Sequence, residues 1–159
     1  MVVPNKPLKI GLISDTHNLV RPQAICALAG VDRILHAGDI CGPEVLDELR
    51  KIAPVVAVRG NNDFGPWAES IQAAERIEIG GVSIYIVHDL GELDFDPKAA
   101  GFRVVVSGHS HRPVINDKNG ILFVNPGSAG PRRFKLPVSI ATLEILAGKV
   151  HAQLHLLQC

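Results

Sequence analysis

Short apolar runs, rich in β-branched residues, recur along the chain, and each ends abruptly in polar residues. The six clearest runs are Leu8–Ile13, Arg33–Ala37, Val55–Val58, Val82–Val87, Phe102–Val106 and Ile121–Val124. Short apolar runs bounded by polar residues and glycine are typical of buried strands. The pattern therefore predicts a β-rich core with polar side chains gathered where the strands end.

Two helical segments fit between the first three predicted strands. Residues Pro22–Ala29 and Pro43–Ile52 each begin with proline, which suits the first turn of a helix. A β-α-β-α-β order implies a parallel sheet with right-handed crossovers.

The second half of the chain connects its strands differently. Gly80-Gly81, Asn119-Gly120 and Gly148-Lys149 each separate two strand-like runs, which is typical of β-hairpins. Val138–Leu146 and Val150–Leu157 would form the last hairpin. Together the two halves predict a mixed β-sandwich with helices outside, in a single domain over residues 1–159 whose residues 1–7 form a loose arm.

Side chains that can bind metal follow several of these runs. In open α/β sheets, ligands bind beyond the carboxyl ends of the strands. Asp15 and His17 follow the first run, and His109 and His111 follow the fifth, each pair separated by one residue. Such spacing on an extended segment lets both side chains turn toward one ion. With Asp39 as a bridging carboxylate, two ions about 3.5–4 Å apart would suit in-line displacement at phosphorus.

Composition narrows the functional classes. The chain of 159 residues is 47% hydrophobic and 20% charged, which indicates a folded domain. The 16 basic and 16 acidic residues give a net charge of zero, so we expect no sequence-specific nucleic-acid partner. The sequence has no long apolar run, which argues against a membrane partner. Three widely spaced cysteines fit neither a disulfide framework nor a zinc ribbon, so a cytoplasmic location is expected. Cys26 falls on the apolar face of the first predicted helix and is expected to pack in the interior.

In type and order, the residues at the strand ends resemble those of the calcineurin-like metallophosphoesterases. The motifs are Asp15-x-His17, Gly38-Asp39, Gly60-Asn61-x-Asp63, His88, Gly108-His109-x-His111 and Asn125-Pro126-Gly127-Ser128. Together with the short chain they are most similar to the small bacterial and archaeal phosphodiesterase branch. The resemblance implies an α/β fold, a four-layer α/β/β/α sandwich of two mixed β-sheets flanked by helices.

The resemblance also implies two divalent metal ions and their ligands. Asp15, His17, Asp39 and His111 would hold the first ion, and Asp39, Asn61, His88 and His109 the second. Manganese is expected, with nickel, iron or zinc as alternatives. The implied activity is hydrolysis of a small phosphodiester or nucleotide-like substrate by a hydroxide that bridges the metals, in a homodimer or higher homo-oligomer.

Some positions near these ligands leave alternatives open. Asn62 stands where many members of the wider superfamily carry histidine, so it is expected to assist catalysis and bind substrate by hydrogen bonds without delivering a proton. Asn125 and Ser128 would either bind substrate or support the ligands, or would only cap the loop that follows a strand. Asp89, where glycine is usual, would either orient a ligand histidine or repel a substrate anion. The basic cluster of Arg132, Arg133 and Lys135 would meet a phosphate or form a solvated loop.

A rival hypothesis is a non-catalytic scaffold. The retromer subunit Vps29 resembles this fold and serves mainly in protein interactions. A scaffold has no need of a complete ligand set such as this chain carries, so the sequence favours the enzyme, with a phosphomonoesterase as a further alternative. Outside the ligand set, His36 is expected to be a hydrogen-bonded core residue, and Asp63 to stabilise its own loop.

Overall fold

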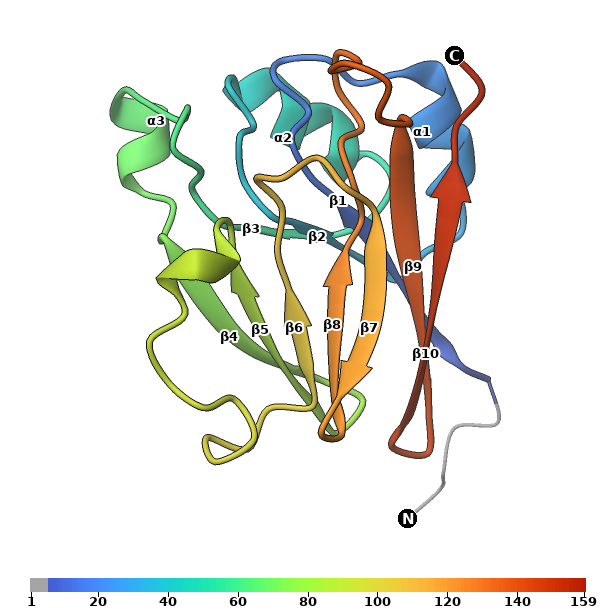
Figure 1. The fold of residues 1–159 in the computed structure, drawn as a ribbon. Helices are drawn as coiled ribbons and strands as arrows, with labels where there is room; N and C mark the ends of the chain where they lie inside the picture. The colour runs from blue at the N-terminus through green and yellow to red at the C-terminus, as the bar shows by residue number, and fades with distance from the viewer. Residues whose placement is uncertain (1–5) are drawn as a thin grey trace.

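The computed structural model describes residues 6–159, which form two five-stranded sheets packed face to face (Figure 1). The first sheet has the order β10-β9-β1-β2-β3 and consists of β1 (Leu8–Ile13), β2 (Arg33–His36), β3 (Val55–Ala57), β9 (Ser139–Leu146) and β10 (Lys149–Leu156). The second has the order β4-β5-β6-β8-β7 and consists of β4 (Ala74–Ile79), β5 (Val82–Val87), β6 (Val104–Val106), β7 (Val114–Lys118) and β8 (Ile121–Asn125). Most of the predicted arm, residues 1–7, lies outside the described residues.

Both sheets are mixed, as the resemblance implied. Strands β1, β2 and β3 run parallel, whereas β9 pairs antiparallel with both β1 and β10. In the second sheet β5, β6 and β8 run parallel, and the edge strands β4 and β7 pair antiparallel with their neighbours. The parallel strands of both sheets send their carboxyl ends to the same end of the sandwich (Figure 1).

Alternate side chains of the strands fill the space between the sheets. Ile10 and Leu12 of β1 are fully buried there, opposite Ile84 and Ile86 of β5. Because successive side chains of a strand point to opposite faces, Ile13 packs on the other face of the sheet. This alternation fixes the register at which each strand ends, and so the direction of the polar residues that follow.

Among residues 6–159, α-helices cover only the first sheet. The α1 helix (Pro22–Ala27) and the α2 helix (Pro43–Arg50) pack on its outer face, each ending two residues before the predicted end. A further short helix, α3 (Pro66–Glu69), follows β3, and a 3₁₀ turn, η1 (Leu90–Glu92), follows β5. The residues between η1 and β6 cover the outer face of the second sheet, where Phe95 and Phe102 pack against Tyr85. The fourth layer of the sandwich is therefore a turn and a loop in place of an α-helix.

Cys26 corrects one sequence expectation, because its side chain is exposed. The six-residue α1 buries Ala24, and Leu28 follows it into the core, which turns Cys26 toward solvent. Within residues 6–159, none of the helices has the length and apolar character needed to cross a membrane.

Candidate metal centre

Left-handed backbone conformations mark the loops that follow the parallel strands. Asp15, His17, Asp39, His109 and His111 all have positive φ, between 44° and 69°. Such conformations cost a non-glycine residue about 1–3 kcal/mol each, and they tend to gather at functional sites. Here they let side chains from three loops, after β1, β2 and β6, turn toward one point.

Within each sheet, backbone hydrogen bonds join the loops that follow neighbouring strands. The Asp15 amide donates to the Gly38 carbonyl at 3.0 Å, and the Gly108 amide donates to the His88 carbonyl at 2.9 Å. Two glycines make the close approach feasible. A Cβ on Gly60 would collide with Asp39, and one on Gly108 would collide with the Ser14 hydroxyl. The glycines of the Gly-Asn and Gly-His motifs are therefore required by packing.

Asp15, His17 and His111 form one group of potential metal ligands, whose ligand atoms lie within 4.8 Å of one another. His111 Nε2 lies 3.4 Å and His17 Nε2 lies 3.9 Å from Asp15 Oδ1. Ser14 Oγ and the His109 amide both donate to the other carboxylate oxygen, Oδ2. Among residues 6–159, Asp15 Oδ1 and His17 Nε2 are buried polar atoms with no hydrogen-bond partner, which is a costly arrangement that a bound cation would relieve.

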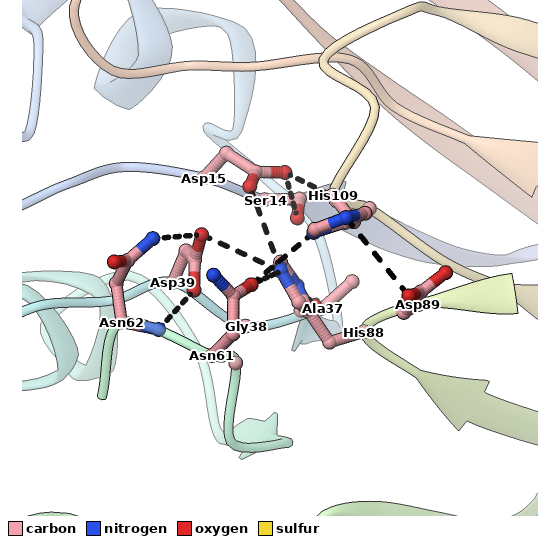
Figure 2. A network of polar contacts seen from close by, with 12 residues as sticks. Ser14, Asp15, Ala37, Gly38, Asp39, Asn61, Asn62, His88, Asp89 and His109 are labelled. Atoms are coloured by element: carbon pink, nitrogen blue, oxygen red, sulfur yellow. Dashed lines mark hydrogen bonds and ion pairs between the residues drawn. The ribbon is translucent and has the colours of Figure 1, made fainter. Parts of the chain in front are cut away.

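Asp15, Asp39 and His88 form a second group, which adjoins the first. His88 Nδ1 lies 2.7 Å from the Ala37 carbonyl, to which its N–H donates, so that Nε2 keeps a lone pair. That Nε2 lies 3.4 Å from Asp39 Oδ2 and 3.0 Å from Asn61 Oδ1 (Figure 2). Three electron-rich atoms facing one another fit a cation between them.

His109 and Asp39 complete the arrangement. His109 Nδ1 lies 3.2 Å from Asn61 Oδ1, on the side of the second group. Asp39 Oδ2 lies 3.4 Å from His88 Nε2 and 3.6 Å from His17 Nε2, so it stands between the two groups. All seven residues predicted as ligands thus lie around one centre.

The two carboxylates are held in their charged form. Burial opposes ionisation of Asp39, but the nearby His88 ring and the hydrogen bonds from Asn62 outweigh it and lower its pKa well below the usual value. Burial likewise opposes ionisation of Asp15, whose pKa is nevertheless lowered by His111 and Ser14. Anionic oxygens among imidazole nitrogens and an amide oxygen suit divalent ions of intermediate softness.

Asp63 and His36 are buried and hydrogen-bonded, as predicted for a loop-stabilising carboxylate and a core histidine. The buried Asp63 carboxylate accepts hydrogen bonds from the amides of Ile40, Cys41 and Gly60, which ties the Asp39 loop to the Asn61 loop. His36 is fully buried, with Nδ1 3.1 Å from the Gly38 amide and Nε2 2.9 Å from Thr16 Oγ1.

The predicted substrate-binding residues make contacts within the protein. The backbone N–H of Asn62 donates a hydrogen bond to Asp39 Oδ1, and its side-chain Nδ2 donates one to Asp39 Oδ2, both at 2.9 Å. The Asn125 side chain donates to the Gly108 carbonyl and accepts from the Gly127 amide. The buried Ser128 hydroxyl donates to the Asp15 carbonyl. For Asn125 and Ser128 these contacts favour support of the ligand loops over contact with substrate.

Two neighbours of the ligands were not identified from the sequence. The Ser14 hydroxyl donates to Asp15 at 2.7 Å, and Cys41 Sγ lies 3.5 Å from His17 Nδ1. Burial and the nearby carboxylates raise the pKa of the Cys41 thiol to about 11, so it stays protonated. Each residue adjoins a motif, but a lone serine or cysteine carries no pattern that would single it out.

Comparison with known proteins places the same residues in a family context. The profile of the calcineurin-like phosphoesterase superfamily domain matches residues 8–148. A probable metallophosphoesterase of Methanocaldococcus jannaschii is 39% identical over 132 residues, covering 75% of this chain and 67% of the relative.

Solved structures share the fold. One described as a novel archaeal phosphodiesterase superposes with a TM-score of 0.77 at 25% identity, covering 92% of this chain and 99% of that one. Vacuolar protein sorting 29 from Cryptosporidium parvum superposes with a TM-score of 0.76 at 22% identity, covering 95% and 98%. The second likeness concerns the fold alone.

Proposed function

Since this chain belongs to the calcineurin-like phosphoesterase superfamily, we propose that it is a phosphodiesterase that works with two divalent metal ions. Its substrate in this proposal is a small phosphodiester, as the phosphodiesterase among its structural relatives suggests. Manganese as the native metal, a cytoplasmic location and a homo-oligomeric state belong to the same proposal.

One observation carries the proposal above the others. Three buried side-chain polar atoms in the described chain have no hydrogen-bond partner, and two of them, Asp15 Oδ1 and His17 Nε2, face the same space as the ionised Asp39. Buried polar groups in folded proteins are nearly always paired. A cation is the partner that suits a carboxylate and a neutral imidazole together.

The seven residues would divide between two ions. Asp15, His17 and His111 would hold the first, and Asn61, His88 and His109 the second, with Asp39 shared. When bound, such ions supply a water of lowered pKa and positive charge for the phosphoryl oxygens. Asp15 and Asp39, held ionised, would keep the ions close together.

Asn62 would act on the phosphoryl group. Its side-chain amide reaches Asp39 Oδ2, so it lies beside the centre and is able to donate a hydrogen bond to a phosphoryl oxygen. An amide does not deliver a proton near neutral pH, which favours esters whose leaving oxygen departs readily as an anion. We therefore expect nitrophenyl esters to react faster than alkyl esters.

Hydrolysis of bis(p-nitrophenyl) phosphate by chelator-treated protein, with and without added Mn²⁺, tests the proposal. Turnover restored by the metal and reduced at least about a hundredfold in Asp39→Asn supports it. Asp47→Asn, which removes the same charge from an exposed site on α2, is the matched control and should leave turnover unchanged. Tight binding of two ions without turnover of any phosphodiester would refute the enzyme and favour a scaffold of the Vps29 kind.

A further inference from the structure

A hollow of about 230 Å³ opens beside His109, on the side of the centre proposed for the second ion. Its walls are largely apolar, with Leu90, Val114 and Phe123 prominent among them. Because His109 is both a lining residue and a proposed ligand, a substrate held at the metals would place one ester group next to this hollow.

Apart from the proposed ligand His109, Asp89 is the only ionisable side chain among the described residues that line the hollow. Its Oδ1 accepts a hydrogen bond from the Gly91 amide at 2.9 Å, which fixes the carboxylate at the start of η1. Its Oδ2 lies 3.9 Å from His109 Nε2 (Figure 2). The side chain is 40% exposed, so this carboxylate is open to a ligand in the hollow.

A second hollow, beside proposed ligands of the first ion, has the opposite charge. It is bordered by His17 and His111 and is also lined by Arg132 and Arg133. An anionic ester group would be attracted to the arginines and repelled by Asp89. The charges of the two hollows therefore orient a diester whose two ester groups differ in charge.

We propose that the hollow beside His109 binds a cationic ester group, such as the ammonium group of an amino alcohol, and that Asp89 is the specificity-determining residue for it. The proposal rests on the function proposed above. The apolar walls would contact the methylene and methyl groups of the amino alcohol, and the carboxylate would pair with its charge. The sequence left two roles open for Asp89, orienting a ligand histidine or repelling a substrate anion, and this proposal favours the second.

Two chromogenic diesters with the same leaving group test the charge alone. One is p-nitrophenyl phosphorylcholine, and the other is its neutral carbon isostere, 3,3-dimethylbutyl p-nitrophenyl phosphate. The ratio of their kcat/KM values with the Mn²⁺-loaded protein should favour the cation. Asp89→Asn, which keeps an oxygen for the Gly91 amide, should lower that ratio by about fivefold, the upper end for a partly exposed ion pair.

Two further variants separate charge in the hollow from other effects. Val114→Lys adds a positive charge at an exposed lining position and should also lower the ratio. Asp94→Asn removes an exposed carboxylate from the same segment, outside the lining, and should leave both rates unchanged.

An unchanged ratio in Asp89→Asn overturns the proposal. If both substrates lose the same factor, Asp89 acts by positioning His109, which also overturns it. Failure of the wild type to hydrolyse any diester, despite bound Mn²⁺, refutes the proposed function itself and is thus distinguishable. Competitive inhibition of p-nitrophenyl phosphorylcholine hydrolysis by glycerophosphocholine supports a soluble amino-alcohol diester, inhibition by phosphatidylcholine vesicles alone supports a lipid headgroup, and inhibition by neither overturns the cationic class.

Discussion

Protonation of His36 should destabilise the protein in mild acid. The ring is fully buried, and its Nδ1 accepts a hydrogen bond from the Gly38 amide, so Nε2 carries the proton and donates to Thr16 Oγ1. A second proton would have to sit on Nδ1, facing the Gly38 N–H. Burial lowers the pKa of His36 from 6.5 to about 4, because desolvation opposes the charged ring.

The sign and size of the effect follow from proton linkage. The unfolded chain binds a proton at His36 as the pH falls through 6.5, whereas the folded protein does not until about pH 4. The free energy of unfolding therefore decreases as the pH is lowered through this window, by up to 1.36 kcal/mol per pH unit. The loss from this residue reaches roughly 2 kcal/mol between pH 7 and pH 5, and about 3 kcal/mol at pH 4.

Other groups titrate in different windows or directions. The lowered pKa values of Asp15 and Asp39 give stability that is present above pH 3.8 and lost below it. His88 acts in the opposite direction. Burial lowers its pKa, but the Asp39 carboxylate raises it overall, so its contribution is present below pH 6.5 and lost as the pH rises through the folded value.

Urea unfolding of chelator-treated protein from pH 7.5 to pH 4.5, for wild type and His36→Asn, isolates His36. Asparagine places an oxygen near the position of Nδ1 for the Gly38 amide and does not titrate. The variant should be less stable than wild type at pH 7. Between pH 7 and pH 5, however, it should lose about 2 kcal/mol less of its free energy of unfolding than wild type loses. Parallel pH profiles for the two proteins would refute the reasoning.

Three further changes have defined outcomes. Replacing Asp63 with alanine leaves three amides without their charged acceptor, so urea unfolding should show a loss of about 3 kcal/mol or more, and a loss below 1 kcal/mol would contradict this. In Gly108→Ala the new Cβ collides with Ser14 beside Asp15, so calorimetry should show Mn²⁺ affinity reduced about tenfold or more; unchanged affinity would disprove the packing argument. Mn²⁺ at a hundred times its Kd should raise the free energy of unfolding by about 2.7 kcal/mol in wild type and by much less in Asp39→Asn, and an equal Tm shift in both would place the ion elsewhere.

Much of the fold could be predicted from the sequence because its strands are short, apolar and sharply ended. The prediction for β1 has the observed bounds, and the glycine turn at Gly80-Gly81 joins β4 to β5 as expected. The four-residue α3 was missed, since it is too short to show a helical period. The loop over the second sheet was missed as well, because Phe95 and Phe102 pack there without any regular spacing.

That the candidate ligands lie close together could be predicted from the sequence, but the geometry of their side chains could not. Strand ends placed Asp15, His109 and their neighbours at one edge, and the structure brings them together. The positive φ of these residues could not be predicted from the sequence, since aspartate and histidine adopt it more often than most residues but still only in a minority of cases. Likewise, the orientation of His109, with Nδ1 toward Asn61 and Nε2 toward Asp89, depends on loops from both sheets.

The order of strands in the first sheet also has a consequence for synthesis. Leu8 of β1 pairs with Ile145 of β9, whereas the second sheet is built from the continuous stretch between Ala74 and Asn125. On the ribosome the second sheet can therefore close while the first still lacks two of its five strands. Until β9 emerges, the strand that carries Asp15 has an unpaired edge, although every proposed ligand has already been translated. Metal capture would then be one of the last events of biogenesis, and a nascent chain arrested before β9 should hold Mn²⁺ more weakly than the finished protein.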